Sequence, residues 1–202
     1  MMRRQALAAG LAAAILTGCG GSFATGFDAP LDEQLSRSWQ VAGVSVAVPA
    51  SLTTTEANVL VPDADIVWHG EPRGDRRAQV ARILEEGLRK GSAGLRGPTR
   101  VALQAQVVEF HGVTPIAVNQ APAAVHNISY VIRVVEASTG EILAGPDAIQ
   151  ADLPAFTQSS AVVAAANGVS ERQRIVDHIA RATAGWLGIG PDPRETFVSL
   201  GR

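Results

Sequence analysis

Four histidines are the side chains best suited to metal binding or proton transfer near neutral pH: His69, His111, His126 and His178. No two of them lie two, three or four positions apart, so the sequence carries no local metal-binding motif. His69 and His111 each end a predicted strand and could approach one another, although we favour positions at the solvent edge of the sheet. His178 lies between Arg174 and Arg181 on the polar side of a predicted helix, where we expect it to be solvated.

The most distinctive polar segment is residues 65–76, which combine an aromatic side chain, a histidine and several charges between two predicted regular elements. Binding residues concentrate in loops on rigid scaffolds, which makes four residues a candidate binding surface: Trp68, His69, Arg73 and Asp75. A simpler interpretation, which we favour, places Trp68 in the core and uses the other residues to begin the next helix. Asp63 and Asp65 could share a proton or a cation, but we expect solvated acids at the start of a strand.

Catalytic motifs have characteristic spacings, and several are missing from this sequence: G-x-S-x-G, H-E-x-x-H, the phosphate-binding loop and the dinucleotide fingerprint. The glycine-rich residues 91–97 follow a predicted helix, whereas a phosphate-binding loop precedes one. We therefore predict no catalytic residues, no metal, no cofactor and no enzymatic activity.

Cys19 is the only cysteine of the 202 residues, and it follows a short apolar run. The chain opens with Arg3 and Arg4, continues with apolar residues to Leu16 and reaches Thr17-Gly18-Cys19, which is typical of a secretory signal. Small residues before a cysteine resemble a bacterial lipobox, in which the thiol receives a diacylglycerol and the new amino terminus is acylated. We predict that residues 1–18 are a lipoprotein signal peptide and that Cys19 is the lipidation site, because several acyl chains anchor stably.

The predicted location is the cell envelope, with the protein anchored on the periplasmic side by acyl chains such as palmitate. In the lipoproteins that this segment resembles, an aspartate after the cysteine favours the inner membrane, so the resemblance implies the outer membrane for a chain with Gly20. Removal of residues 1–18 leaves 15 basic against 19 acidic side chains, a net charge of −4. A chain with no basic excess lacks the electrostatic footprint of nucleic-acid binding, so we exclude nucleic acid as a partner.

The hydrophobic periodicity predicts two helices and a set of strands. Asp75 is a suitable cap for a helix to about Lys90, and Ser170 with Gln173 forms a capping pattern for a helix to about Leu187. Strands are predicted at 40–48, 64–69, 100–110, 128–134 and 142–144, the first central in the sheet and the last three forming an antiparallel meander. The predicted fold is α+β, with a mostly antiparallel sheet of about five strands and two helices packed on one face.

The predicted domain organisation has four parts. After the signal peptide, residues 19–38 form the lipid anchor and a flexible tether, residues 39–188 form a single α+β domain, and residues 189–202 form a loosely held tail. Two long uncharged segments, 112–125 and 153–169, are either interfaces or flexible connections.

Four features together resemble a family of short Gram-negative lipoproteins classed as a domain of unknown function: the lipobox, "ADIVWHGEPRGDRRAQV", "HNISYVIRVVEASTGEILAGP" and the last predicted helix. The resemblance covers most of the mature chain and implies no catalytic or binding residues. More loosely, the order of elements is similar to that of compact α+β lipoproteins that assist envelope transport and assembly.

These observations predict a membrane-anchored periplasmic lipoprotein without enzymatic activity. Its expected role is binding or accessory, with an envelope protein as partner in transport, assembly or maintenance. The alternative is a module that binds a small ligand or lipid in a pocket between sheet and helices near Trp68. A less favoured alternative is an enzyme that uses His69, His111 or Asp65.

Overall fold

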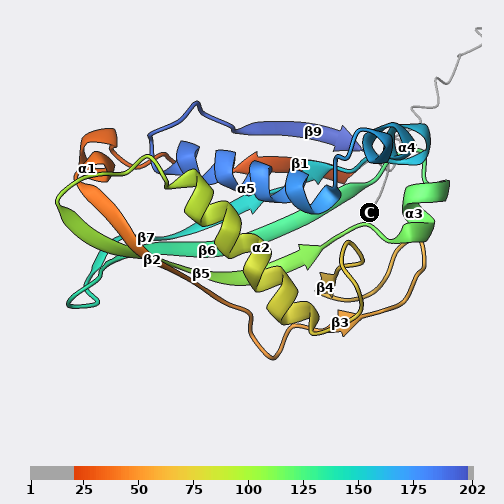
Figure 1. Ribbon diagram of the computed structural model, residues 1–202, viewed down its shortest axis with the longest axis horizontal. Helices are drawn as coiled ribbons and strands as arrows, with labels where there is room; N and C mark the ends of the chain where they lie inside the picture. Colours follow the sequence, from red (N-terminus) through yellow and green to blue (C-terminus); the bar gives the residue numbers. More distant parts are fainter. Residues whose placement is uncertain (1–20, 200–202) are drawn as a thin grey trace, which may run out of the picture.

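The computed structural model describes residues 21–199 and shows an α+β fold (Figure 1). The signal peptide and Cys19 lie outside the described residues. The described strands are β1 (Gly21–Gly26), β2 (Trp39–Ala47), β3 (Thr54–Thr55), β4 (Ile66–Val67), β5 (Thr99–His111), β6 (Val125–Glu136), β7 (Ile142–Ala151), β8 (Leu153–Pro154) and β9 (Glu195–Ser199). The described helices are α1 (Glu33–Arg37), α2 (Arg76–Gly91), α3 (Pro115–Gln120), α4 (Gln158–Ala166) and α5 (Glu171–Trp186).

The predicted fold is wrong in the size of the sheet, in strand direction and in the number of helices, of which residues 21–199 contain five instead of two. The sheet formed by these residues has nine strands: seven follow the order β3-β4-β5-β6-β7-β1-β9, while β2 pairs with β5 and β8 pairs with β6. The meander of β5, β6 and β7 is antiparallel, as predicted, but β2, β3 and β4 join through parallel pairs. Parallel neighbours need a long crossover connection, and the segment containing α2 supplies it between β2 and β5. Alternation along one strand does not reveal its partner, so the parallel pairs were missed.

Both ends of the described chain form paired strands where a tether and a loose tail were expected. β1 and β9 are antiparallel, from Gly21 opposite Ser199 to Thr25 opposite Glu195. Phe23, only 5% exposed, stacks on Phe197 with ring centroids 5.8 Å apart. Burial of these aromatic rings favours the paired arrangement, because apolar area removed from water stabilises it.

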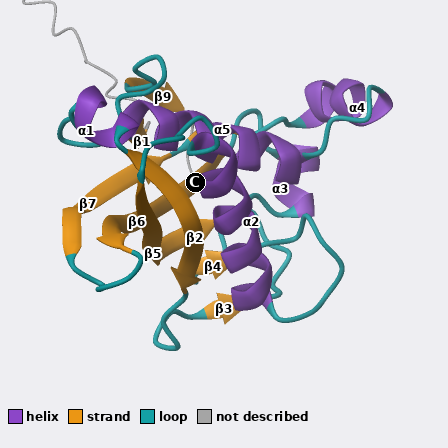
Figure 2. Cartoon of the chain, turned by 60° about the vertical axis from the view of Figure 1, so that its left-hand side comes forward, coloured by secondary structure: helices purple, strands orange, loops and turns teal. Residues whose placement is uncertain are grey.

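The two long helices cover one face of the sheet, as Figure 2 shows. Both predicted N-caps are confirmed: Asp75 Oδ1 accepts from Ala78 N at 3.1 Å, and Ser170 Oγ accepts from Gln173 N at 3.1 Å. The return bond of a capping box is not formed at α5, because Gln173 Nε2 donates to Asp177 Oδ1 at 2.8 Å. The apolar side of α2 is fully buried at Val80, Ile83, Leu84 and Leu88. Three tryptophans, Trp39, Trp68 and Trp186, are also buried in this core.

The close approach of α2 and α5 depends on Gly87. A Cβ atom at this position would lie 2.5 Å from Ile179 Cγ2 and 3.2 Å from the Val176 carbonyl oxygen. We expect Gly87→Ala to lower the free energy of unfolding by about 1–3 kcal/mol through overpacking, although alanine favours a helix by about 1 kcal/mol over glycine. Urea unfolding monitored by circular dichroism measures the change. Gly94→Ala is the control because nothing lies within 4 Å of its added Cβ, and equal effects at the two positions would contradict the prediction.

Candidate functional site

The candidate site is the face of the sheet opposite α2 and α5, here called the open face. Alternation along the strands directs apolar side chains towards the helices and leaves small or polar ones on the other side. The open face carries Ala42, Ser45 and Ala47 of β2, Gln104 and Gln106 of β5, Val131 and Arg133 of β6, and Pro146 and Ala148 of β7. No other element among residues 21–199 packs over this set as α2 and α5 do on the opposite face.

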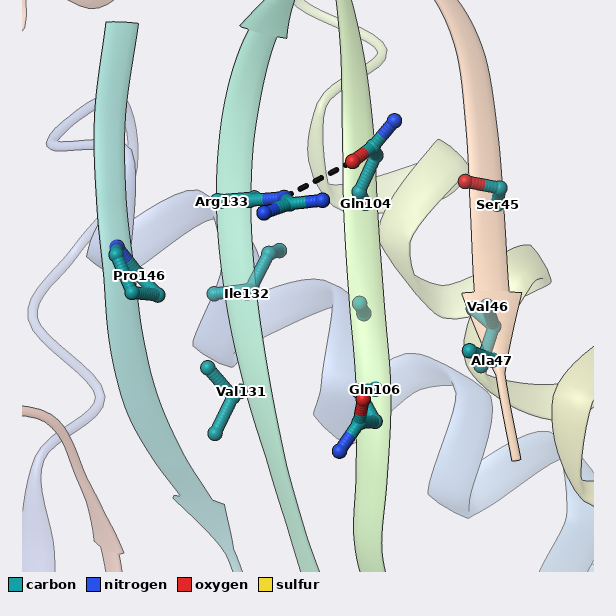
Figure 3. A pocket seen from close by; sticks show the side chains of 10 residues that line it. Ser45, Val46, Ala47, Gln104, Gln106, Val131, Ile132, Arg133 and Pro146 are labelled. Carbon is teal, nitrogen blue, oxygen red and sulfur yellow. Dashed lines mark hydrogen bonds between the residues drawn. The ribbon is translucent and has the colours of Figure 1, made fainter. Parts of the chain in front are cut away.

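The open face contains a depression of about 520 Å³ that crosses β2, β5, β6 and β7 (Figure 3). At its centre Arg133 Nε donates to Gln104 Oε1 at 2.9 Å. On the β7 side the register shifts opposite β6, and Gly145 takes a φ of +80°, a conformation that glycine adopts readily. This irregularity brings Pro146 to the rim of the depression.

The chemistry of the depression suits recognition. Gln104 and Gln106 supply amide donors and acceptors, and Ser45 supplies a hydroxyl. The one ionisable side chain of its lining is Arg133, whose planar guanidinium can present several N–H donors to carboxylate or carbonyl oxygens. The lining therefore offers hydrogen-bonding groups for recognition.

The sequence revealed part of this surface. The polar alternation of Gln104 and Gln106 in β5 and of Arg133 in β6 was visible in the pattern. Ser45 was missed because the uncharged small residues of β2 indicated a central strand, whereas β2 is an edge strand with pairing to β5 alone among the described strands. Pro146 was missed because β7 was expected to end at residue 144 and continues to Ala151.

Two of the residues predicted from segment 65–76, Trp68 and Asp75, have structural positions. Trp68 is 2% exposed, packs edge-on against Phe110 and donates its indole N–H to Glu71 Oε2 at 3.1 Å. Asp75 caps α2. Arg73 is exposed at the surface, 3.5 Å from a carboxylate oxygen of Glu56. The interpretation that Trp68 fills the core and its neighbours begin the helix therefore holds.

The other polar residues singled out from the sequence lie around β4 and the end of β5. Asp65 Oδ2 accepts from the backbone N–H and the hydroxyl of Thr53, both at 2.7 Å, and these hydrogen bonds lower its pKa. Asp63 is exposed. His69 follows β4 and is half-buried, and this burial lowers its pKa. His111 ends β5 opposite Val67, so the sheet brings the neighbourhoods of the two histidines together. His111 is only 6% exposed, so the expected position at the solvent edge is wrong for this residue.

Two further histidines connect α5 to the sheet. His126 Nδ1 accepts from Val113 N at 3.3 Å, so its Nε2 donates to Glu171 Oε2 at 2.9 Å. Burial alone would raise the pKa of Glu171, but the hydrogen bond from His126 and the charge of Arg174 outweigh it and lower that pKa. Arg174 Nη1 completes the cluster at 2.6 Å from Glu171 Oε2.

His178 is buried, contrary to the expectation of a solvated side chain. Its Nδ1 accepts from Arg181 Nη2 at 3.2 Å, since arginine has no acceptor, and its Nε2 then donates to Thr25 Oγ1 at 2.9 Å. Burial, with the positive charge of Arg181, lowers the pKa of His178 to about 4. Helical periodicity placed His178 beside polar neighbours but gave no sign that β1 covers this side of α5.

Residues 21–199 contain no group of three or more His, Cys, Asp or Glu side chains arranged to hold a metal ion. In the same part of the chain, no helix combines the length and the apolar character needed to cross a membrane.

Comparison with solved structures finds distant likenesses. A protein from Caulobacter crescentus CB15 described as a candidate lipoprotein is 15% identical over 77% of this chain and 94% of its own, with a TM-score of 0.35. Protein XCC0632 of Xanthomonas campestris, of family DUF330, is 14% identical over 81% of this chain and 90% of its own, with a TM-score of 0.44. A PelC dodecamer from Paraburkholderia phytofirmans is 16% identical over 82% of this chain and 96% of its own, with a TM-score of 0.35. These TM-scores are too low for any functional conclusion.

A comparison with curated proteins finds no match. Residues 39–202 match a family of unknown function, DUF6778, which covers most of the chain and confirms the predicted membership of an unknown-function family. The chain belongs to the DUF6778 family.

Proposed function

We propose that this protein is a lipid-anchored periplasmic lipoprotein that binds an envelope protein through the open face. The proposal combines the lipobox at Cys19 with the arrangement of the domain. The observation that carries the binding role is the layer asymmetry: α2 and α5 cover one face of the sheet, while the other presents a depression of about 520 Å³. Acylation holds the domain at the outer membrane, and the partner acts in envelope transport, assembly or maintenance.

A protein partner fits this surface better than a small enclosed ligand. The depression crosses four strands on the uncovered face of the sheet and is open to solvent, so a partner can lie across the strands without entering a closed cavity. It also adjoins β2, whose outer side pairs with no described strand. An extended segment of a partner can pair with such an edge through main-chain hydrogen bonds and place side chains in the depression.

The alternative of a ligand pocket near Trp68 has little room in the core. A Cβ atom at Gly70 would collide with the Trp68 ring. On another side of the ring, a Cβ atom at Gly112 would lie 3.1 Å from Trp68 Cε3. The backbone thus closes around the indole, and Phe110 packs against it.

A non-enzymatic role agrees with the use of the buried ionisable groups. His126 and Glu171 link the start of β6 to the start of α5, and His178 links α5 to β1. Arg76, 5% exposed, bonds Glu56 through Nε at 2.6 Å and Gln79 through Nη1 at 2.8 Å. Each of these groups is held by partners that a reacting substrate would have to displace.

Site-specific photocrosslinking in intact cells tests the proposal. A photoreactive amino acid at Gln106, on the open face, is expected to capture an envelope protein in the full-length lipoprotein. The same residue at Arg82, exposed on α2 in the helix layer, is the matched control and should capture none. Adding Arg133→Glu to the Gln106 probe should reduce the yield of the adduct at least severalfold. Equal capture from both positions, or capture unaffected by Arg133→Glu, would contradict the proposed surface.

A further inference from the structure

One end of the molecule is built from three uncharged segments, here called the uncharged end. They are residues 57–62, 112–125 and 153–170, which contain no Asp, Glu, Lys, Arg or His. The first contacts the second where Thr114 Oγ1 donates to the Val59 carbonyl at 2.8 Å. The second contacts the third where Gln158 Nε2 donates to the Ala121 carbonyl at 3.1 Å. Figure 1 shows α3 and α4 side by side at this end.

Large apolar side chains project from the uncharged end into solvent. The exposed fractions are 47% for Val59, 48% for Leu60, 60% for Val61, 70% for Val162, 60% for Val163 and 43% for Val169. α4 has no buried residue and projects away from the body in Figure 2. Beside it lies an open groove of about 500 Å³, whose lining combines apolar residues with polar ones and with Arg174: Phe156, Ser159, Ser160, Val163, Ala164, Asn167, Val169 and Arg174. Contiguous exposed apolar surface of this kind marks an interaction site.

The first described strand begins at the same end of the sheet. Asp152 N donates to the Ala24 carbonyl at 3.0 Å, and β1 runs antiparallel to β7. Because the strands are antiparallel, residues that precede Ala24 lie beyond the end of β7, in the direction in which the chain continues to β8 and α4. Gly21 therefore lies at the α4 end of the sheet. The end of β5 and the start of β6 lie at this end too, because both flank α3.

The proposed lipid anchor is very close to this end. Cys19 precedes Gly21 by two residues, and two extended residues span at most about 7 Å. Acyl chains on Cys19 therefore hold the start of β1 against the bilayer, with almost no tether between them. A domain held so closely presents the surrounding surface to the lipid.

We propose that the uncharged end rests on the phospholipid bilayer, with Leu60, Val61, Val162 and Val163 inserted at the boundary between headgroups and acyl chains. The proposal rests on the proposed lipid anchor and adds the orientation of the domain. The four inserted side chains are apolar, so their insertion avoids the large cost of burying a charge. The strands then point away from the membrane, and the open face looks sideways, where a neighbouring envelope protein can reach it.

Fluorescence of site-specific labels on the acylated full chain tests this orientation. Cys19 is the only cysteine and is consumed by acylation, so one introduced cysteine can carry an environment-sensitive dye. Val162→Cys and Leu60→Cys report on the uncharged end, and Ser138→Cys is the control, in the exposed β6–β7 turn at the opposite end. In vesicles of phosphatidylethanolamine and phosphatidylglycerol, we expect a blue shift and quenching by doxyl lipids at 162 and 60. The emission at 138 should remain that of a dye in water.

The possible results separate the anchor from the orientation. Flotation of the acylated protein with vesicles, lost in Cys19→Ala, supports the anchor; no flotation of the acylated protein overturns both proposals. Flotation with water-like emission at 162 and 60 overturns the orientation alone. A blue shift without doxyl quenching, together with crosslinking between copies through position 162, also overturns the orientation. In that case a second copy of the chain covers the uncharged end in place of the bilayer.

Discussion

Replacing Trp186 with alanine is expected to lower the free energy of unfolding by about 3–5 kcal/mol, the range for a buried Trp-to-Ala change. Trp186 is fully buried at the end of α5, and its indole N–H donates to Asp147 Oδ2 on β7 at 2.9 Å. The substitution creates a cavity between α5 and the sheet and removes the hydrogen-bond donor to a half-buried carboxylate. Both effects act in the same direction.

Urea unfolding followed by far-ultraviolet circular dichroism measures this loss without relying on tryptophan fluorescence. Trp186→Phe is the matched variant, because it keeps an aromatic ring but leaves Asp147 without its donor. We expect a smaller loss of about 1–3 kcal/mol from it. If Trp186→Ala cost less than Trp186→Phe, the packing role assigned to the indole would be wrong.

Acidification is expected to destabilise the protein through His178. Its pKa falls from an ordinary 6.5 to about 4 in the folded state, mainly because of burial and then because of the charge of Arg181. Between these two values the unfolded chain binds more protons than the folded one, so stability rises with pH. The stabilisation that depends on neutral His178 is fully present above about pH 6.5 and falls as the pH is lowered towards 4. The free energy of unfolding lost over this range through His178 is about 3 kcal/mol.

A comparison of the wild type with His178→Gln isolates this contribution. Glutamine is neutral at every pH. The free energy of unfolding of His178→Gln should therefore change less than that of the wild type between neutral pH and about pH 4.5. Several carboxylates with lowered pKa values, among them Glu171 and Asp177, also contribute. Their stabilisation is lost mostly at lower pH and in both proteins, so it cancels in the difference. Parallel pH profiles for the two proteins would show that His178 does not titrate as described.

The sequence predicted local features well, because they depend on residues close together in the chain. The caps at Asp75 and Ser170 were predicted and are present. The antiparallel meander followed from alternation within each strand. The position of Trp68 in the core also followed, because a large apolar ring next to a strand is most stable when buried.

Pairings between distant segments were beyond the sequence, and the open face depends on them. β2 lies at an edge of the sheet because it pairs only with β5 among the described strands. The two-residue periodicity of its sequence cannot indicate which strands it pairs with. The burial of His178 is decided by β1, 153 positions away at Thr25. The polar neighbours of His178 on its own helix indicated solvent instead.

For this protein, the predicted location in the cell envelope and the resemblance to a family both came from the sequence alone. A lipobox is a short linear motif that functions as an extended peptide. It can therefore be identified from its residues without knowledge of the folded domain. The tertiary structure decided which sheet face is covered, where the uncharged segments gather and how close the first strand begins to Cys19. These follow from the packing of elements far apart in the chain, because burial of the shared apolar surface of α2, α5 and the sheet selects one arrangement of the whole.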